Sequence, residues 1–204
     1  MKKVLAWHYT DGMKLRDGQP LKVGKVYRHR GAIVPCESGL HASVRLIDAL
    51  SFAPGCQLSR VEMRGKVVEN GSPVDKIIGR ERKVLWTMDA TRTLWLFACW
   101  VAEDALKAER KAGREPRAAS WAAPKARRDW LAGKITDEQL SAAYRAADSA
   151  AYSAAHRAAY RAAYRAADSA ADSAADSAAY RAARDRQDHK LTTMIMQAHA
   201  KGKK

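Results

Sequence analysis

Cysteines are scarce in this chain, and long apolar runs are absent. The three cysteines, Cys36, Cys56 and Cys99, are odd in number and form no closely spaced pair, so neither a disulfide framework nor a zinc ribbon is predicted. No apolar stretch approaches the roughly 20 residues of a membrane-spanning helix, and the one after Met1-Lys2-Lys3 is too short for a signal peptide. We therefore expect an intracellular, cytoplasmic protein with reduced thiols, no metal site and no membrane partner.

The segment from Ala142 to Asp185 contains no Gly, Pro, Cys or Glu. It repeats one four-residue unit eleven times, two alanines followed by a pair drawn mostly from Tyr-Arg and Asp-Ser. Alanine favours helix and lets neighbouring backbones approach closely, whereas the segment offers few groups for covalent chemistry. The repeat therefore predicts a helical interaction surface, with self-association as one use of it, and it does not indicate a reaction.

Acidic residues are outnumbered by basic ones in both halves of the chain. Residues 1–89 carry 16 basic and 9 acidic groups (+7), and residues 90–204 carry 21 and 13 (+8), which gives +15 in total. In the second half the excess lies on either side of the repeat, with 9 basic and 3 acidic groups (+6) in 107–134 and 5 and 1 (+4) in 186–204. Such an excess favours encounters with nucleic acid, anionic membrane or acidic proteins, and it does not choose among them.

Arginine and tyrosine side chains in the repeat add groups that contact phosphates and stack on bases. The residues predicted to bind nucleic acid or another partner are Lys107, Arg110, Lys111, Arg114, Arg117, Lys125, Arg127, Arg128, Arg157, Tyr160, Arg161, Tyr164, Arg165, Lys201, Lys203 and Lys204. The alternative for the repeat is a solvated helix face whose Arg and Asp residues pair with one another.

The first half of the chain alternates between β-forming stretches and turns. The segment Leu58–Val68 has mostly apolar residues at every second position and charged residues between them, which is typical of a half-buried strand. Further strands are predicted over Val4–Thr10, Gly24–His29 and Lys76–Thr87, and a short helix over Val44–Ala53. Together these elements predict a small, twisted, mostly antiparallel sheet with one helix.

The second half contains no predicted strand. One helix is expected from Asp89 to about Ala112, and a shorter one carries Trp121 and Trp130. We therefore predict an α+β fold, with a small α+β domain over residues 1–89 followed by an alanine-rich helical bundle over residues 90–204.

Thr136-Asp137-Glu138-Gln139 has the form of a capping box and predicts the start of the helix that contains the repeat. Neither Gly nor Pro follows before Gly202, so one continuous helix is expected. Four residues advance an ideal helix by about 400°, so the alanine stripe drifts by about 40° per unit. Such a helix either meets several partners along its length, or bends or breaks.

Two polar clusters in the first half favour an enzymatic alternative. Trp7-His8-Tyr9-Thr10 and the segment from Gly39 to Ser43 resemble the first two signature regions of ADP-ribosyltransferase-like folds. That resemblance implies an NAD pocket with the site residues His8, Tyr9, His41, Ser43 and Glu62. Without it, no cofactor is predicted. The flanking Arg60 and Arg64 instead favour an ionised, salt-bridged role for Glu62 on the surface.

Two further resemblances concern longer stretches. Residues 36–43 (CESGLHAS) and 48–55 (DALSFAPG) resemble an uncharacterised domain of bacteriophage and prophage proteins that often precedes low-complexity repeats. Residues 96–106 (LFACWVAEDAL) and 129–136 (DWLAGKIT), with the alanine tract, resemble alanine-rich helical immunity proteins. They imply a phage or prophage accessory protein in the cytoplasm of the host bacterium that binds nucleic acid or a host protein and modulates host functions or defence.

Overall fold

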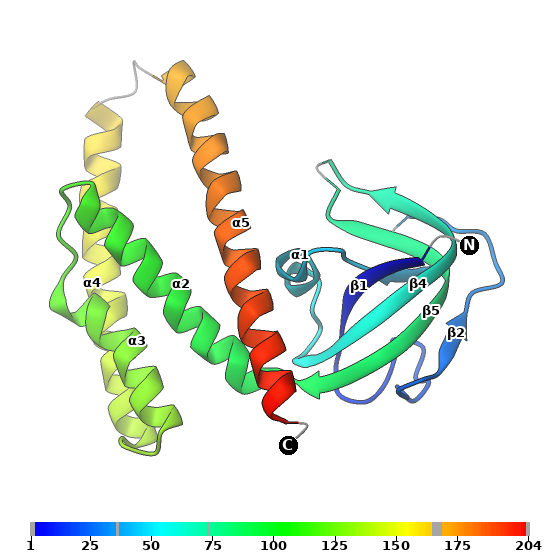
Figure 1. The fold of residues 1–204 in the computed structure, drawn as a ribbon. Helices are drawn as coiled ribbons and strands as arrows, with labels where there is room; N and C mark the ends of the chain where they lie inside the picture. Colours follow the sequence, from blue (N-terminus) through cyan, green and yellow to red (C-terminus); the bar gives the residue numbers. More distant parts are fainter. Residues whose placement is uncertain (1–2, 36, 73, 165–168, 203–204) are drawn as a thin grey trace. The chain divides into compact units, whose positions relative to one another are not determined.

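The computed structural model describes residues 3–35, 37–72, 74–164 and 169–202, and within 151–178 it describes the backbone only (Figure 1). The chain forms two compact units: Met1–Thr91 together with Gln187–Lys204, and Arg92–Arg186. The boundary predicted at residue 89 lies beside the first of these divisions. Residues 187–204, which the sequence pattern placed with the helical half, instead group with the sheet.

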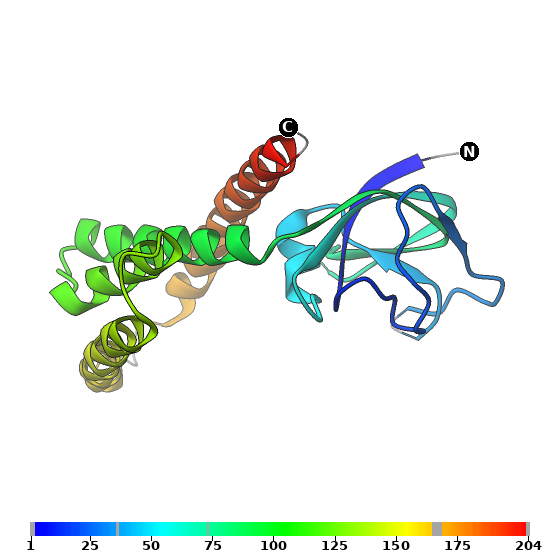
Figure 2. The same cartoon turned by 90° about the horizontal axis from the view of Figure 1, so that it is seen from below.

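The first unit contains a five-stranded antiparallel sheet. Its strands are β1 (Lys3–Thr10), β2 (Val26–Arg28), β3 (Leu40–Ala42), β4 (Gln57–Asn70) and β5 (Lys76–Asp89). The order is β1-β4-β5-β2, and β3 pairs with the first part of β5. Directly after β3, Ser43 bridges to Trp7 on β1, so the strongly curved sheet returns toward its first strand (Figure 2). The sequence pattern predicted four of these strands and missed β3.

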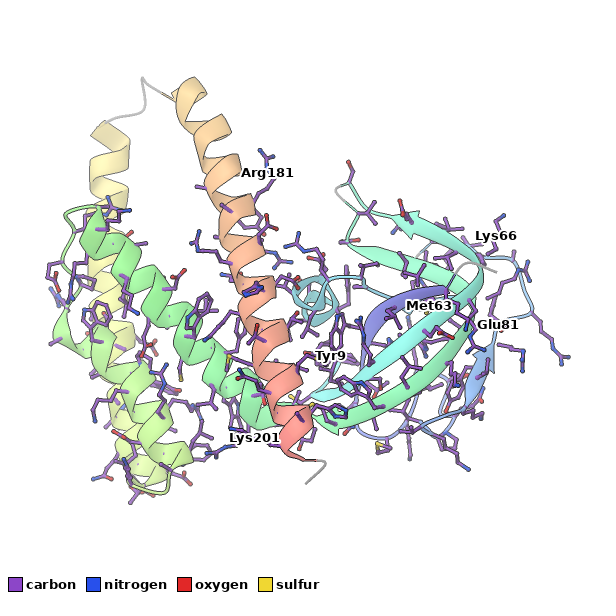
Figure 3. The ribbon with its side chains drawn as sticks, viewed as in Figure 1. Tyr9, Met63, Lys66, Glu81, Arg181 and Lys201 are labelled. Atoms are coloured by element: carbon purple, nitrogen blue, oxygen red, sulfur yellow. The ribbon has the colours of Figure 1, made fainter. Side chains whose placement is uncertain are left out.

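Alternation of side chains gives the sheet two chemically different faces. The core face carries Ala6, Val61 and Val84, which lie opposite one another on β1, β4 and β5 and are fully buried. Met63, labelled on β4 in Figure 3, belongs to the same apolar cluster. The opposite side is here called the outer face. It carries Leu5 and Trp7 of β1 and their cross-strand partners on β4, Glu62 and Arg60.

Two helical segments belong to the sheet unit. One is α1 (Leu46–Ser51), and the other is the last part of α5 (Ser169–Lys201). The carboxylate of Asp188 on α5 accepts a hydrogen bond from the backbone N–H of Ile47 on α1 at 2.9 Å. Further along α5, Leu191 and Ile195 have no exposed surface. This part of α5 therefore packs into the unit along the side that carries Leu191 and Ile195.

An aromatic contact adds to the attachment of α5. The ring of His199 stacks on Trp86 of β5, with centroids 3.9 Å apart and planes inclined by 15°. Trp86 in turn meets the edge of Trp7 at 5.7 Å, and the guanidinium of Arg60 lies 4.2 Å from the centroid of Trp7. Because Trp7, Arg60 and Trp86 are direct cross-strand partners, this row of the outer face forms the platform on which His199 rests.

The second unit is helical. It contains α2 (Thr91–Lys111) from Arg92 onward, α3 (Ala118–Leu131), α4 (Asp137–Tyr164) and the part of α5 up to Arg186. The predicted α+β fold class is therefore confirmed, with a sheet followed by helices. None of the described helices is both long and apolar enough to cross a membrane.

The predicted capping box is present at the start of α4. The Thr136 backbone N–H donates to Gln139 Oε1 at 2.9 Å, and the Gln139 N–H donates to Thr136 Oγ1 at 3.3 Å. The repeat that follows lies in α4 and α5. Residues 165–168 between these two helices lie outside the described residues, as do the side chains of 151–178, so the predicted continuity of the helix falls on residues that the structure does not describe.

The guanidinium of Arg127 on α3 connects three helices of the second unit. It lies 5.3 Å from the ring of Trp95 on α2, 5.1 Å from Trp130 on its own helix and 5.1 Å from Tyr144 on α4. Its Nε also donates to the Tyr144 hydroxyl at 2.6 Å. Since Arg127 sits among three aromatic rings, its side chain serves helix packing.

Candidate functional site

His8 lies on the core face of the sheet, where it is half-buried. Its cross-strand neighbours are Ser59 on β4 and then Thr87 on β5, whose hydroxyl groups lie 3.4 Å apart. Burial, followed by the positive charges of Arg82 and His41, holds the pKa of His8 well below its usual value of 6.5. At neutral pH His8 is therefore an uncharged imidazole in a polar part of the core face.

Glu62 lies on the outer face, because its partner on β1 is Leu5 and not His8. Its carboxylate accepts a hydrogen bond from Arg64 and lies 3.8 Å from the ammonium of Lys3. Glu62 is thus a salt-bridged residue directed away from the face that carries His8, as its basic neighbours in the sequence indicated.

The remaining residues of the enzymatic alternative do not complete a pocket either. Tyr9 is buried on the outer face, and burial raises the pKa of its phenol. Ser43 is buried and pairs through its backbone with Trp7 at 2.8 and 3.0 Å. His41 is half-buried, and burial lowers its pKa while a backbone hydrogen bond at Gly39 acts in the opposite direction. Tyr9 and Glu62 therefore lie on the face of the sheet opposite to His8.

A cavity of about 240 Å³ lies beside the start of α1 and the turn between β4 and β5. None of the five residues of the enzymatic alternative lines it. Its lining residues are Val44, Arg45, Asp48, Val74, Asp75, Lys76 and Ile77. Among the described residues, no three His, Cys, Asp or Glu side chains are grouped as a metal site requires.

The turn between α2 and α3 gathers five of the predicted binding residues. Two of them are neutralised: Arg110 binds Glu115 through contacts of 2.7 to 3.1 Å, and Arg114 binds Glu109 at 2.6 and 2.8 Å. Hydrogen bonds to these carboxylates raise the pKa of both arginines. All four groups are exposed, and pairs of this kind contribute little to stability.

Three cations at this turn have no acidic partner among the described residues. Lys107 and Lys111 lie four residues apart on α2 and therefore on one side of the helix, and Arg117 immediately precedes α3. All three are exposed. Because the only acidic groups between residues 107 and 117 are Glu109 and Glu115, the turn carries a net charge of five minus two, +3.

The predicted binding residues on α3 are occupied by other contacts. Lys125 pairs with Asp129 at 2.6 Å, and Arg128 binds Glu103 of α2 through two nitrogens. Arg127 is held among aromatic rings. Sequence spacing did not reveal the contacts of Arg128 with Glu103, or of Arg127 with Trp95 and Tyr144, because these partners lie on other helices.

Of the other predicted residues, Arg157, Tyr160, Arg161 and Tyr164 lie on α4, and Lys201 lies on α5. Lys201 is exposed near the C-terminal end of α5 (Figure 3). Outside the described residues lie Arg165, Lys203 and Lys204, together with the side chains of Arg157, Tyr160, Arg161 and Tyr164.

Sequence reasoning missed one residue of the sheet unit. Arg82 on β5 lies opposite Met63, on the core face, and is only 4% exposed. Its position two residues before the buried Val84 was the available signal, since side chains alternate along a strand. The three charged residues around Arg82, at positions 80, 81 and 83, obscured that pattern.

Comparisons with known proteins add no relative to this picture. No protein-family model, curated protein or solved structure matches the chain. The resemblances to a phage domain and to alanine-rich immunity proteins therefore stay predictions.

Proposed function

We propose that this chain is a nucleic-acid-binding accessory protein of a bacteriophage or prophage, and that it binds the phosphate backbone through the turn between α2 and α3. The observation that supports the proposal is the presence of Lys107, Lys111 and Arg117 at this turn. Each is exposed and has no acidic partner among the residues that the structure describes, while both nearby carboxylates are already neutralised.

Phosphate contacts by such residues release condensed counterions and give binding that is strong at low salt and independent of sequence. The described aromatic side chains of this unit lie largely against arginines or other rings, so stacking on bases is not the main contribution proposed. The overall charge of +15 supports the encounter with a polyanion.

The test measures the affinity of the full chain for a fluorescent DNA duplex at several salt concentrations. Changing Lys107, Lys111 and Arg117 together to Gln should reduce the slope of log affinity against log salt by about 2.7, or about 0.9 for each lost phosphate contact. The matched control changes three exposed lysines of the sheet unit, Lys14, Lys22 and Lys66, to Gln, with the same loss of charge.

An equal loss of slope in both triple variants would show that net charge alone drives binding, and the proposed surface would be wrong. Absence of any binding by the unaltered chain at about 50 mM salt would overturn nucleic acid as the partner. The predicted host-protein partner would then be the remaining one.

A further inference from the structure

Arg82 carries a positive charge into the interior of the sheet unit. Its residue is 4% exposed, and burial lowers its pKa from 12.5 to about 10, so the guanidinium is still protonated at neutral pH. A buried charge is stable only when it is paired and its donors are satisfied. The usual partner of a buried guanidinium is a carboxylate or a phosphate, bound through two parallel hydrogen bonds.

The described residues do not supply such a partner. Nη1 of Arg82 donates to the backbone carbonyl of His41 at 2.8 Å, which is a neutral acceptor. Nε is buried and has no hydrogen-bond partner in the described part of the chain. The carboxylate of Asp17 acts electrostatically on the guanidinium, but no ion pair joins Asp17 to Arg82 among the described residues. The hydroxyl of Tyr27 is protonated and donates to Pro20 at 2.6 Å.

Strand pairing brings a second hydrogen-bond donor, His8, to the region of the Arg82 guanidinium. The hydrogen bond to the carbonyl of His41 joins the Arg82 side chain of β5 to β3. Ser43 directly follows β3 and bridges to Trp7 on β1, which is next to His8. His8 lies on the core face of β1. The positive charge of Arg82 contributes to the lowered pKa of His8, which is consistent with this arrangement. The region therefore contains a guanidinium and an imidazole, and among the described residues no carboxylate pairs with either.

We propose that Arg82, together with His8 on the same face of the sheet, binds a phosphate group in the interior of the sheet unit. The free Nε edge of Arg82 donates to two phosphate oxygens, and a ring N–H of His8 donates to a third. The bound anion supplies the negative charge that the surrounding residues lack. This inference does not depend on the proposed binding of a nucleic-acid backbone by the helical unit.

The test titrates inorganic phosphate into the full chain by calorimetry, in a phosphate-free buffer with chloride holding the ionic strength constant. We expect saturable binding at one site per chain and a rise in Tm with phosphate. Arg82→Met, which keeps the length of the side chain but removes its charge, should weaken binding at least tenfold. The matched control is Arg80→Met on the same strand, because Arg80 is exposed and its loss changes the net charge equally.

Two further arms identify the source of the phosphate group. A 5′-phosphorylated dinucleotide that competes with inorganic phosphate, while its unphosphorylated form does not, would indicate a terminal phosphate monoester. Competition by neither dinucleotide would indicate a free anion. The proposal is wrong if the unaltered chain shows no saturable binding, an outcome that does not depend on whether Arg82→Met folds. It is also wrong if Arg80→Met and Arg82→Met weaken binding equally.

Discussion

Replacing Leu191 with Ala tests whether the end of α5 is part of the sheet unit. Leu191 has no exposed surface and lies between Asp188, which binds the N–H of Ile47, and the fully buried Ile195. Removing a buried leucine side chain beyond Cβ costs the transfer free energy of three carbon groups and leaves a cavity, in total about 2 to 5 kcal/mol. The matched control is Met196→Ala on the same helix, where the side chain is 47% exposed and the expected cost is within about 0.5 kcal/mol.

Hydrogen exchange followed by mass spectrometry is the suitable measurement, because it reports each segment of the full chain separately. In Leu191→Ala we expect faster exchange for amides of β1, β4 and β5, since these strands share a unit with residue 191. Met196→Ala should leave those rates unchanged. If exchange in Leu191→Ala increased only in helices of the second unit, or matched that of Met196→Ala throughout, the assignment of α5 to the sheet would be refuted.

Two other outcomes can be measured by denaturant unfolding. Thr136→Ala removes one half of the capping box and should destabilise α4 by about 1 kcal/mol, whereas Thr136→Ser should retain most of it; equal losses would contradict a capping role. His8 has a lowered pKa in the folded chain, so below about pH 6.5 the unfolded chain binds a proton that the folded chain does not. The unaltered protein should therefore lose about 1 kcal/mol more than His8→Gln between pH 7.5 and 5.5, and parallel pH profiles would disprove this.

Local patterns predicted the elements of this fold well. The alternation in residues 58–68 identified β4, and the Thr-x-x-Gln spacing identified the start of α4. In both cases the deciding interactions lie within a few residues of one another. The strand β3 was missed because its three residues owe their conformation to pairing with β5, more than 30 residues away in the sequence.

The candidate site residues were harder to predict, because their contacts join segments that are far apart in the sequence. A count of basic residues cannot show that Arg128 binds Glu103 or that Arg127 lies against Trp95 and Tyr144, because these partners come from other helices. The sequence pattern likewise placed residues 187–204 with the helical half, whereas they group with the sheet. Leu191 and Ile195 have the four-residue spacing of a buried helix side. The spacing does not indicate whether this side of the helix packs in the sheet unit or in the helical unit, because that depends on contacts between distant segments.

The division of the chain into units has a consequence for synthesis on the ribosome. The sheet unit draws on two segments, one ending at Thr91 and one beginning at Gln187. The 95 residues between them, 92–186, take about 5 to 20 s to translate. During that interval His199, whose ring stacks on Trp86 in the folded chain, has not yet been synthesised. A nascent strand pair with an uncovered tryptophan row is a target for chaperones and proteases, and a premature stop anywhere in the alanine repeat would leave it in that condition permanently.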